Sequence, residues 1–341
     1  MTTPTAPKRP RVFSGIQPSG LLHLGNYLGA VAQWVAGQGE KETYVCIVDM
    51  HAITMPRDPA MLRHQTRATA AQLLAAGIDP QQSTLFVQSH VRAHVEGCWI
   101  LTCITPVGWL ERMTQYKARA ARQESVGAGL LIYPVFQAAD ILLYDVDEVP
   151  VGEDQRQHVE LTRDIAQRFN GLYGETFVLP RAVIRASGAR IMALDNPSIK
   201  MSKSDAARGR VINLIDAPDE IRHAIRRAVT DPGREIVFSD RPEKAGVNNL
   251  LQIYELLTGK TRAEIEAHFA GAGYGTLKAE VAAVVVDALR PIRERYDRLM
   301  ADQAALDRLL ANGAERARAV AEPKIRAIKD KVGFMPGPLT W

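Results

Sequence analysis

Residues 11–26 read RVFSGIQPSGLLHLGN, and this stretch decides the fold because it joins three different local patterns. Residues 11–17 form a short apolar run that favours a strand, and Pro18-Ser19-Gly20 follows it as a tight turn. Residues 26–35 then have the apolar spacing of a helix. The stretch therefore predicts a strand that passes through a turn directly into a helix.

The same order continues along the chain. Residues 43–48 (TYVCIV) and 83–88 (STLFVQ) are apolar without alternation, as expected of strands buried on both faces. A helix from residue 59 to about 76 separates them, with Asp58 as its N-cap and Pro59 as its first residue. This order of strands and helices predicts the α/β class, with a Rossmann-like, doubly wound parallel sheet. Ligands of such sheets bind at the carboxyl ends of the strands.

The pattern becomes helical in the second half of the chain. Residues 134–144 (PVFQAADILLY) read as a helix that begins at its proline, 148–151 as a strand, and 155–170 as a long helix ended by Gly171. After a polar loop at 195–206, helical spacing recurs near 219–229, 248–257, 261–269, 278–300 and 312–331. We therefore predict a disordered tail (1–10), a Rossmann-like catalytic domain (11–206), an all-helical domain (207–305) and a C-terminal helix (306–341) that packs back on the catalytic domain.

The composition excludes several classes of protein. Of the 341 residues, 46% are hydrophobic and 23% are charged, which is typical of a soluble globular protein. A net charge of +4 is too small for a histone-like polycation, but it allows a local basic face. No window approaches about 18 consecutive apolar residues, and residues 1–11 have no secretory apolar core, so we expect no membrane segment. Cys46, Cys98 and Cys103 lack paired spacing, which predicts reduced thiols, a cytoplasmic location and no zinc or iron–sulfur site.

The first chemical motif lies between the first strand and the first helix. Free N–H groups and the helix dipole at that helix N-terminus can hold a phosphate chain. Gly20 and Gly25 let a nucleotide approach the backbone closely, while His23 and Asn26 offer donors to phosphate oxygens. The same residues are also compatible with an ordinary strand–turn–helix connection.

A second motif, Lys200-Met201-Ser202-Lys203-Ser204, lies in a polar stretch. Its lysines and serines form a cationic loop that can close over a pyrophosphate leaving group and stabilise the charge that develops there. Taken alone, such a string is more often a solvated surface loop.

The two motifs together point to a family. An HxGN sequence after the first strand, followed far downstream by KMSKS, is the paired signature of class I aminoacyl-tRNA synthetases. Within that class the chain resembles the bacterial tryptophanyl-tRNA synthetases in segments that follow in the expected order: 13–20, 47–54, 111–115, 138–144, 149–155 and 188–192. The resemblance covers about residues 11–330, and it implies that the all-helical domain binds the anticodon.

The resemblance implies an ATP-dependent reaction in two steps. The carboxylate of tryptophan attacks the α-phosphate of ATP, which gives tryptophanyl-adenylate and pyrophosphate, and the terminal adenosine of the tRNA then accepts the aminoacyl group. Catalysis is positioning and charge stabilisation, with Mg²⁺ accompanying ATP. The implied catalytic residues are His23, Asn26, Lys200 and Lys203. The implied ATP-binding residues are Gln17, Pro18, Ser19, Gly25, Asn26, Gly152, Glu153, Asp154, Ile191, Lys200, Met201, Ser202, Lys203 and Ser204.

Selection of the amino acid can also be argued from the residues themselves. The spacing of Tyr133, Gln137 and Asp140 places them on one helix face. An indole needs a wide apolar slot with one acceptor for its N–H, and Asp140 supplies that acceptor. By resemblance, the other residues that bind tryptophan are Phe13, Gln17, His51, Ile141, Val149, Val151 and Gln155.

Three positions depart from the family pattern. Gln137 stands where the family typically carries methionine, and its combination with Tyr133 and Asp140 is similar to the arrangement in tyrosyl-tRNA synthetases. Ile199 and Arg119 stand where lysines are usual. The alternatives are therefore a tyrosyl-tRNA synthetase, or a non-charging paralogue that binds tryptophan or a partner protein.

The resemblance implies tryptophan tRNA as a partner and a homodimer as the assembly. Arginines of the helical half could contact tRNA phosphates, although each is more often part of a solvated helix face. These candidates are Arg222, Arg226, Arg227, Arg290, Arg293, Arg295 and Arg298.

Overall fold

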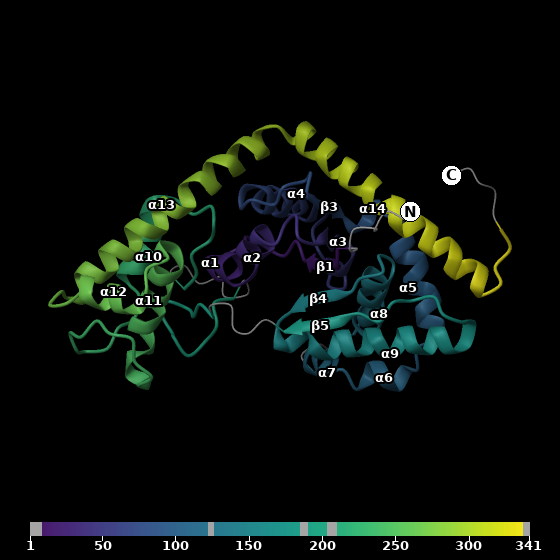
Figure 1. Cartoon of the computed structure of the whole chain (residues 1–341), viewed down its shortest axis with the longest axis horizontal. Coiled ribbons are helices and arrows are strands. Elements are labelled where there is room, and N and C mark those ends of the chain that lie inside the picture. Colours follow the sequence, from purple (N-terminus) through teal and green to yellow (C-terminus); the bar gives the residue numbers. More distant parts are fainter. Residues whose placement is uncertain (1–8, 122–125, 185–189, 203–209, 337–341) are drawn as a thin grey trace, which may run out of the picture.

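The computed structural model describes residues 9–121, 126–184, 190–202 and 210–336. An α/β part with a central sheet stands beside a purely helical part (Figure 1). Two long helices, α13 (Tyr274–Ala301) and α14 (Gln303–Lys331), arch from the helical part back over the α/β part. The expected α/β class with a helical C-terminal region is confirmed.

Within the described ranges, the sheet has five parallel strands in the order β3-β2-β1-β4-β5. From β1 the sheet grows outward to β2 and β3 on one side and to β4 and β5 on the other, which makes the gap between β1 and β4 the topological switch point. The sequence pattern did not reveal the last strand. The strands are β1 (Arg11–Ile16), β2 (Glu42–Ile47), β3 (Ser83–Val87), β4 (Glu148–Val151) and β5 (Arg181–Ile184).

The strands at the switch point pair differently with their neighbours. β1 pairs with β2 along its whole length, from Arg11 opposite Glu42 to Ile16 opposite Ile47. Its register with β4 is a single pair near the amino ends, Val12 opposite Glu148. Space therefore opens between the carboxyl halves of β1 and β4.

Both faces of the sheet are covered, as the unbroken apolar strands predict. Along β2, Tyr44 and Cys46 pack into one core and Val45 and Ile47 into the other, because successive side chains of a strand point to opposite faces. The first core includes side chains of α5, α8 and α9, and the second includes α4 and the helical part. These helices are α4 (Pro59–Ala75), α5 (Ala93–Ile104), α8 (Ala128–Leu142) and α9 (Arg156–Tyr173).

Shorter helices complete the described part of the chain. A π-helical turn, η1 (Tyr27–Val31), joins α1 to α2. No helix within the described ranges is long and apolar enough to cross a membrane. The shorter helices are α1 (Leu24–Asn26), α2 (Ala32–Ala36), α3 (Asp49–Ala52), α6 (Val107–Glu111), α7 (Thr114–Ala120), α10 (Pro218–Arg226), α11 (Ala245–Thr258) and α12 (Arg262–His268).

Two helix boundaries differ from those expected. Pro134 does not begin a helix: α8 begins at Ala128, after the N-cap Gly127, and Pro134 is buried inside it. Proline removes one intrahelical hydrogen bond, but the apolar segment before it, with Leu130 only 1% exposed, packs into the core as helix. Gly171 does not end α9, which continues to Tyr173. The left-handed residue that ends it is Gly174, with φ +89°.

The last helix, α14, lies along the outer strand β3. Arg316 donates hydrogen bonds to the carbonyl oxygen of Pro80 and to Thr84 Oγ1, and Lys329 pairs with Glu96 of α5 at 2.8 Å. The helix thereby covers an edge whose unpaired N–H and C=O groups would otherwise be exposed. The expected domain boundary after residue 305 lies in the first turn of α14, and the one at 206 lies outside the described residues.

Candidate active site

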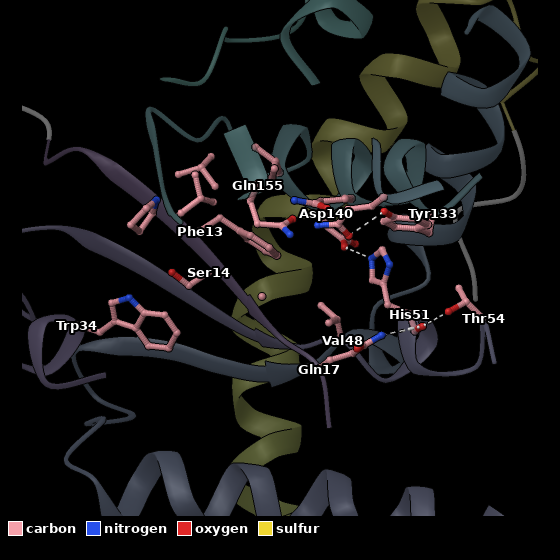
Figure 2. Close-up of a pocket in the computed structure, with 17 residues that line it drawn as sticks. Phe13, Ser14, Gln17, Trp34, Val48, His51, Thr54, Tyr133, Asp140 and Gln155 are labelled. Carbon is pink, nitrogen blue, oxygen red and sulfur yellow. Dashed lines mark hydrogen bonds and ion pairs between the residues drawn. The ribbon is translucent and has the colours of Figure 1, made fainter. Parts of the chain in front are cut away.

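A cavity occupies the gap at the switch point, between β1, β4, α3 and α8 (Figure 2). Its volume is about 260 Å³. Every residue that the sequence assigns to the tryptophan slot lines it: Phe13, Gln17, His51, Tyr133, Gln137, Asp140, Ile141, Val149, Val151 and Gln155.

Asp140, from α8, is the buried charge of this cavity, with 1% of its surface exposed. Its Oδ2 lies 2.8 Å from Nε2 of His51, and its Oδ1 lies 2.6 Å from Nδ1 of His94. The amide nitrogen of Gln88 donates to both oxygens, at 2.7 and 2.9 Å. Since an ionised carboxylate can only accept hydrogen bonds, Nε2 of His51 and Nδ1 of His94 are the donors. Three side chains thus satisfy a carboxylate that would be costly to bury alone.

These donors also set the charge of Asp140. Burial alone would raise the pKa of Asp140, but hydrogen bonds from His51 and His94 outweigh that effect and lower the pKa to about 2. The carboxylate is therefore an anion at neutral pH. An anionic acceptor beside the apolar side chains of Phe13, Ile141 and Val149 favours a flat apolar ligand that carries one N–H or O–H donor.

Polar groups hold the rest of the cavity wall. The hydroxyl of Tyr133 donates to Oε1 of Gln115 at 3.2 Å and lies 2.8 Å from Nε2 of His158. Gln17 donates through Nε2 to the backbone carbonyl of His51 at 3.0 Å, as Figure 2 shows. The end of β1 is thereby tied to α3, the helix that carries His51 toward Asp140.

Several residues of the cavity wall, and two residues behind it that contact Asp140, could not be picked out from the sequence. Gln88 directly follows β3, so the rule that ligands bind at strand ends could have indicated it. His94 lies on α5, a helix without a clear sequence signal, and nothing local marks it. The lining residues that were not expected are Ser14, Gly15, Trp34, Val48, Thr54, Gln115 and Pro150.

The first motif folds as a turn followed by a capped helix. Nδ1 of His23 accepts from the backbone N–H of Asn26 at 3.1 Å, and Oδ1 of Asn26 accepts from the backbone N–H of His23 at 3.2 Å. This reciprocal cap leaves the proton of a neutral His23 on Nε2. A Cβ on Gly25 would lie 3.1 Å from the His23 ring and 3.5 Å from Cβ of Ile191. His23, Gly25 and Ile191, all expected near ATP, are therefore packed together.

The segment that leads into the second motif is a hairpin. The N–H of Met201 donates to the carbonyl of Ile191 at 3.0 Å, and Lys200 stands opposite Met192. Met201 is 1% exposed, whereas Lys200 is exposed and Ser202 is half-buried. Lys203 and Ser204 lie outside the described residues.

The helical part holds this hairpin from behind. Asn249 of α11 accepts from the backbone N–H of Met192 at 2.8 Å and donates to its carbonyl at 3.0 Å. The segment that begins at residue 210 contacts the first motif, since Leu24 N–H donates to the carbonyl of Ile212 at 2.8 Å. The hairpin is therefore fixed to α11, and the first motif to the segment around Ile212.

The expected ribose-binding segment stands at the end of β4. Gly152, Glu153 and Asp154 are exposed there, next to the cavity residue Val151, and Glu153 pairs with Arg156 at 2.7 Å. Pro18 is buried, and the N–H of Ser19 donates to the carbonyl of Gln17 at 2.9 Å.

No group of three or more His, Cys, Asp or Glu side chains in the described ranges could hold a metal ion.

Some arginines expected to face tRNA have local partners. Arg222 pairs with Asp219 at 2.8 Å, and Arg290 pairs with Asp287. Both pairs join residues one helical turn apart. They correspond to the solvated helix face that was the alternative for these arginines.

Residues 5–290 match the family model described as tRNA synthetases class I (W and Y). The tryptophan–tRNA ligase of Gloeobacter violaceus is 52% identical over 333 residues, which cover 97% of this chain and 98% of that relative. The solved tryptophanyl-tRNA synthetase of Campylobacter jejuni, in complex with ADP and tryptophan, has a TM-score of 0.84 at 37% identity and covers 95% of this chain and 100% of its own. The structure of the Mycoplasma pneumoniae tryptophanyl-tRNA synthetase has a TM-score of 0.86 at 34% identity, with 96% and 98% covered.

Proposed function

This chain belongs to the class I tRNA synthetases for tryptophan and tyrosine, and on that premise we propose that it attaches tryptophan to tryptophan tRNA at the expense of ATP. The resemblance drawn from the motifs is thus confirmed over nearly the whole chain. The observation that carries the proposal is the buried anion Asp140, which lies beside apolar side chains in a cavity lined by all the residues expected to bind tryptophan.

In the first step, a carboxylate oxygen of tryptophan attacks the α-phosphorus of ATP. The new bond is a carboxyl–phosphate anhydride, the bond between the α-phosphorus and its bridging oxygen breaks, and pyrophosphate leaves. Gln17 belongs both to the cavity and to the first motif, so it stands where the amino acid and the nucleotide must meet. The reaction needs no covalent enzyme intermediate, and its rate depends on alignment of the two substrates.

The two motifs supply donors and positive charge to the phosphates. His23 and Asn26 hold the turn of the first motif through their reciprocal cap, while Lys200 and Lys203 neutralise the departing pyrophosphate; Mg²⁺ accompanying ATP would add positive charge there. Two of the residues expected to bind ATP lie just past strand ends, Gln17 after β1 and Gly152 after β4. In the second step, a ribose hydroxyl of the terminal adenosine takes the aminoacyl group and AMP leaves.

The tRNA is expected to use the helical part for its anticodon, and the reaction belongs in the cytoplasm with the other components of translation. Figure 1 shows the helical part at one end of the molecule, with α5 toward the other end. The contacts of Asn249 with Met192 give the helical part a direct connection to the Lys200 hairpin.

We assign the homodimer to an exposed apolar stripe on α5 and α6, which we call the α5–α6 face: Val95, Trp99, Cys103 and Val107. Trp99 is 67% exposed, and Val107 is 58% exposed. The first three are spaced four residues apart, which places them on one side of α5. An aromatic anchor in an apolar stripe is typical of the centre of a protein interface.

Trp99→Glu is expected to convert the dimer into a monomer, because the interface would have to bury an unpaired carboxylate. Light scattering after size-exclusion chromatography measures the mass directly. Leu256→Glu on α11, where Leu256 is 42% exposed, adds the same charge far from the α5–α6 face and should leave the dimer intact. A wild-type monomer, or a dimer that survives Trp99→Glu, would contradict this assignment.

The function itself is tested by ATP–pyrophosphate exchange with tryptophan and tyrosine side by side, followed by aminoacylation of tryptophan tRNA. We expect exchange only with tryptophan, and charging of that tRNA. Exchange driven only by tyrosine would favour the alternative suggested by Gln137. Binding of tryptophan and ATP without any charging would favour the non-charging paralogue.

A further inference from the structure

A layer of polar side chains lies behind the cavity, where it contacts Asp140 but lines no part of the cavity wall. It consists of Gln88, His94 and Tyr144, each completely or almost completely buried. We infer that the Tyr144–His94 pair is a positioning device, which holds Asp140 as an oriented acceptor so that the site selects ligands carrying an indole N–H. This inference rests on the proposed function and adds two residues that determine its specificity.

The geometry is a chain of three groups. The hydroxyl of Tyr144 lies 2.8 Å from Nε2 of His94, and Nδ1 of the same ring lies 2.6 Å from Oδ1 of Asp140. Both His94 and Tyr144 are 0% exposed. Water does not reach these two side chains, so the surrounding residues fix their positions.

The chain of hydrogen bonds favours one tautomer of a neutral His94. In that tautomer Nδ1–H donates to the carboxylate, and Nε2 accepts from the phenol O–H. The opposite tautomer would point the lone pair of Nδ1 at an anion. Burial raises the pKa of Tyr144 well above its ordinary value, so the phenol keeps the proton that it donates.

Packing holds Tyr144 itself in place. Its ring lies 4.6 Å from that of Tyr44, and 5.8 Å from those of Phe13 and Phe86, between ring centroids. Phe13 also lines the cavity, so the same aromatic cluster supports both the apolar wall and the donor chain. The next residue, Asp145, has a left-handed φ of +49°, so the chain turns directly after Tyr144.

The consequence is a division between the two oxygens of Asp140. Oδ1 accepts hydrogen bonds from His94 and Gln88, two buried side chains behind the cavity wall. Oδ2 accepts from Gln88 and from His51, and His51 lines the cavity. A ligand N–H therefore finds Oδ2 at a fixed place and angle. Buried polar groups of this kind discriminate strongly against an analogue that lacks the matching donor.

The test uses the full chain and measures kcat/KM in ATP–pyrophosphate exchange for tryptophan and for 3-(benzothiophen-3-yl)alanine, in which sulfur replaces the N–H. Tyr144→Phe should lower kcat/KM for tryptophan about fivefold through KM, as expected for one lost buried hydrogen bond. The kcat/KM for the benzothiophene analogue and the KM for ATP should change little. Tyr44→Phe is the matched control, because it removes a buried hydroxyl from the same cluster, one that donates to Glu42 Oε1 instead of to His94.

Substitutions of His94 provide the second arm. His94→Leu removes both hydrogen bonds and should lower the preference for tryptophan over the analogue by at least about tenfold. His94→Asn places an amide donor where Nδ1 stood and should restore part of that preference. Thermal unfolding of each variant separates a loss of selectivity from a loss of folded protein.

A pH profile gives a further readout. Asp140 is faced by His51 from α3, His94 and Cys98 from α5, Cys46 from β2 and Tyr144 after α8. Loss of the His94 donor leaves the effect of burial less opposed, so the pKa of Asp140 rises. In His94→Leu, tryptophan-dependent activity should therefore begin to fall at a higher pH than in the wild type as the solution is acidified.

Two kinds of failure are distinguishable. If wild-type protein shows no tryptophan-dependent exchange, the proposed function fails, and the positioning role fails with it. Two results with an active wild type would overturn only the positioning role. In one, Tyr144→Phe, like Tyr44→Phe, changes kcat/KM equally for tryptophan and the benzothiophene analogue. In the other, His94→Leu keeps the wild-type preference for tryptophan.

Discussion

Asp140→Asn is expected to lower kcat/KM for tryptophan on the order of 100-fold, while exchange with 3-(benzothiophen-3-yl)alanine changes only a few-fold. Both carboxylate oxygens accept hydrogen bonds, Oδ1 from His94 and Oδ2 from His51. An asparagine in either orientation must therefore turn its own NH₂ group toward one of these donors. The loss of a charged acceptor and of a buried partner for a histidine amounts to about 3 kcal/mol.

The measurement compares KM, kcat and binding of tryptophan in the wild type, Asp140→Asn and Asp140→Ala. Asp164→Asn is the control, because it makes the same chemical change at an exposed position of α9. We expect this control to behave as the wild type. Unchanged tryptophan kinetics in both Asp140 variants would refute Asp140 as the acceptor, and an equal loss for tryptophan and the benzothiophene analogue would show a collapsed site instead of a lost hydrogen bond.

Asp140 could be predicted from the sequence because its neighbours carry the information. It lies in the segment 138–144 and shares a helix face with Tyr133 and Gln137, so spacing and resemblance both indicate it. His94 stands in a segment with no recognisable motif, and its role depends on the packing of α5 against α8, which joins residues distant in sequence. Local patterns report helix faces and strand ends, but not which buried donor meets which acceptor.

The fold shows the same division. The buried strands β1, β2 and β3 follow from unbroken apolar runs, whereas β5, with intermediate and exposed residues, gives no such signal. Pro134 was misleading because a local rule places proline at a helix start, while burial of Leu130 and its neighbours extends the helix beyond it. The close packing of α14 on β3 requires a glycine at one position, and no periodicity in the sequence distinguishes that glycine.

That glycine, Gly313, leads to the largest expected effect on stability. Its Cα faces the backbone of β3 so closely that an added Cβ would overlap the carbonyl oxygen of Leu85 and lie 2.9 Å from the carbonyl carbon. Leu85 cannot retreat, because it pairs with Val45 of β2 inside the sheet. The helix must move instead, which strains the contacts of Arg316 with Thr84 and of Lys329 with Glu96.

Gly313→Ala is therefore expected to lower the free energy of unfolding by about 3 kcal/mol, near the upper end of the usual range for overpacking. Alanine in an unobstructed helix would instead stabilise it by about 0.5–1 kcal/mol, so the sign of the effect reports the contact with β3. Gly275→Ala is the matched control, because Gly275 is an exposed residue of the long helix α13 and a Cβ there meets nothing within 4 Å. Midpoints of thermal unfolding, measured by calorimetry, should move down for Gly313→Ala and slightly up for Gly275→Ala. If both midpoints moved up, the result would contradict the close contact between the backbones of α14 and β3.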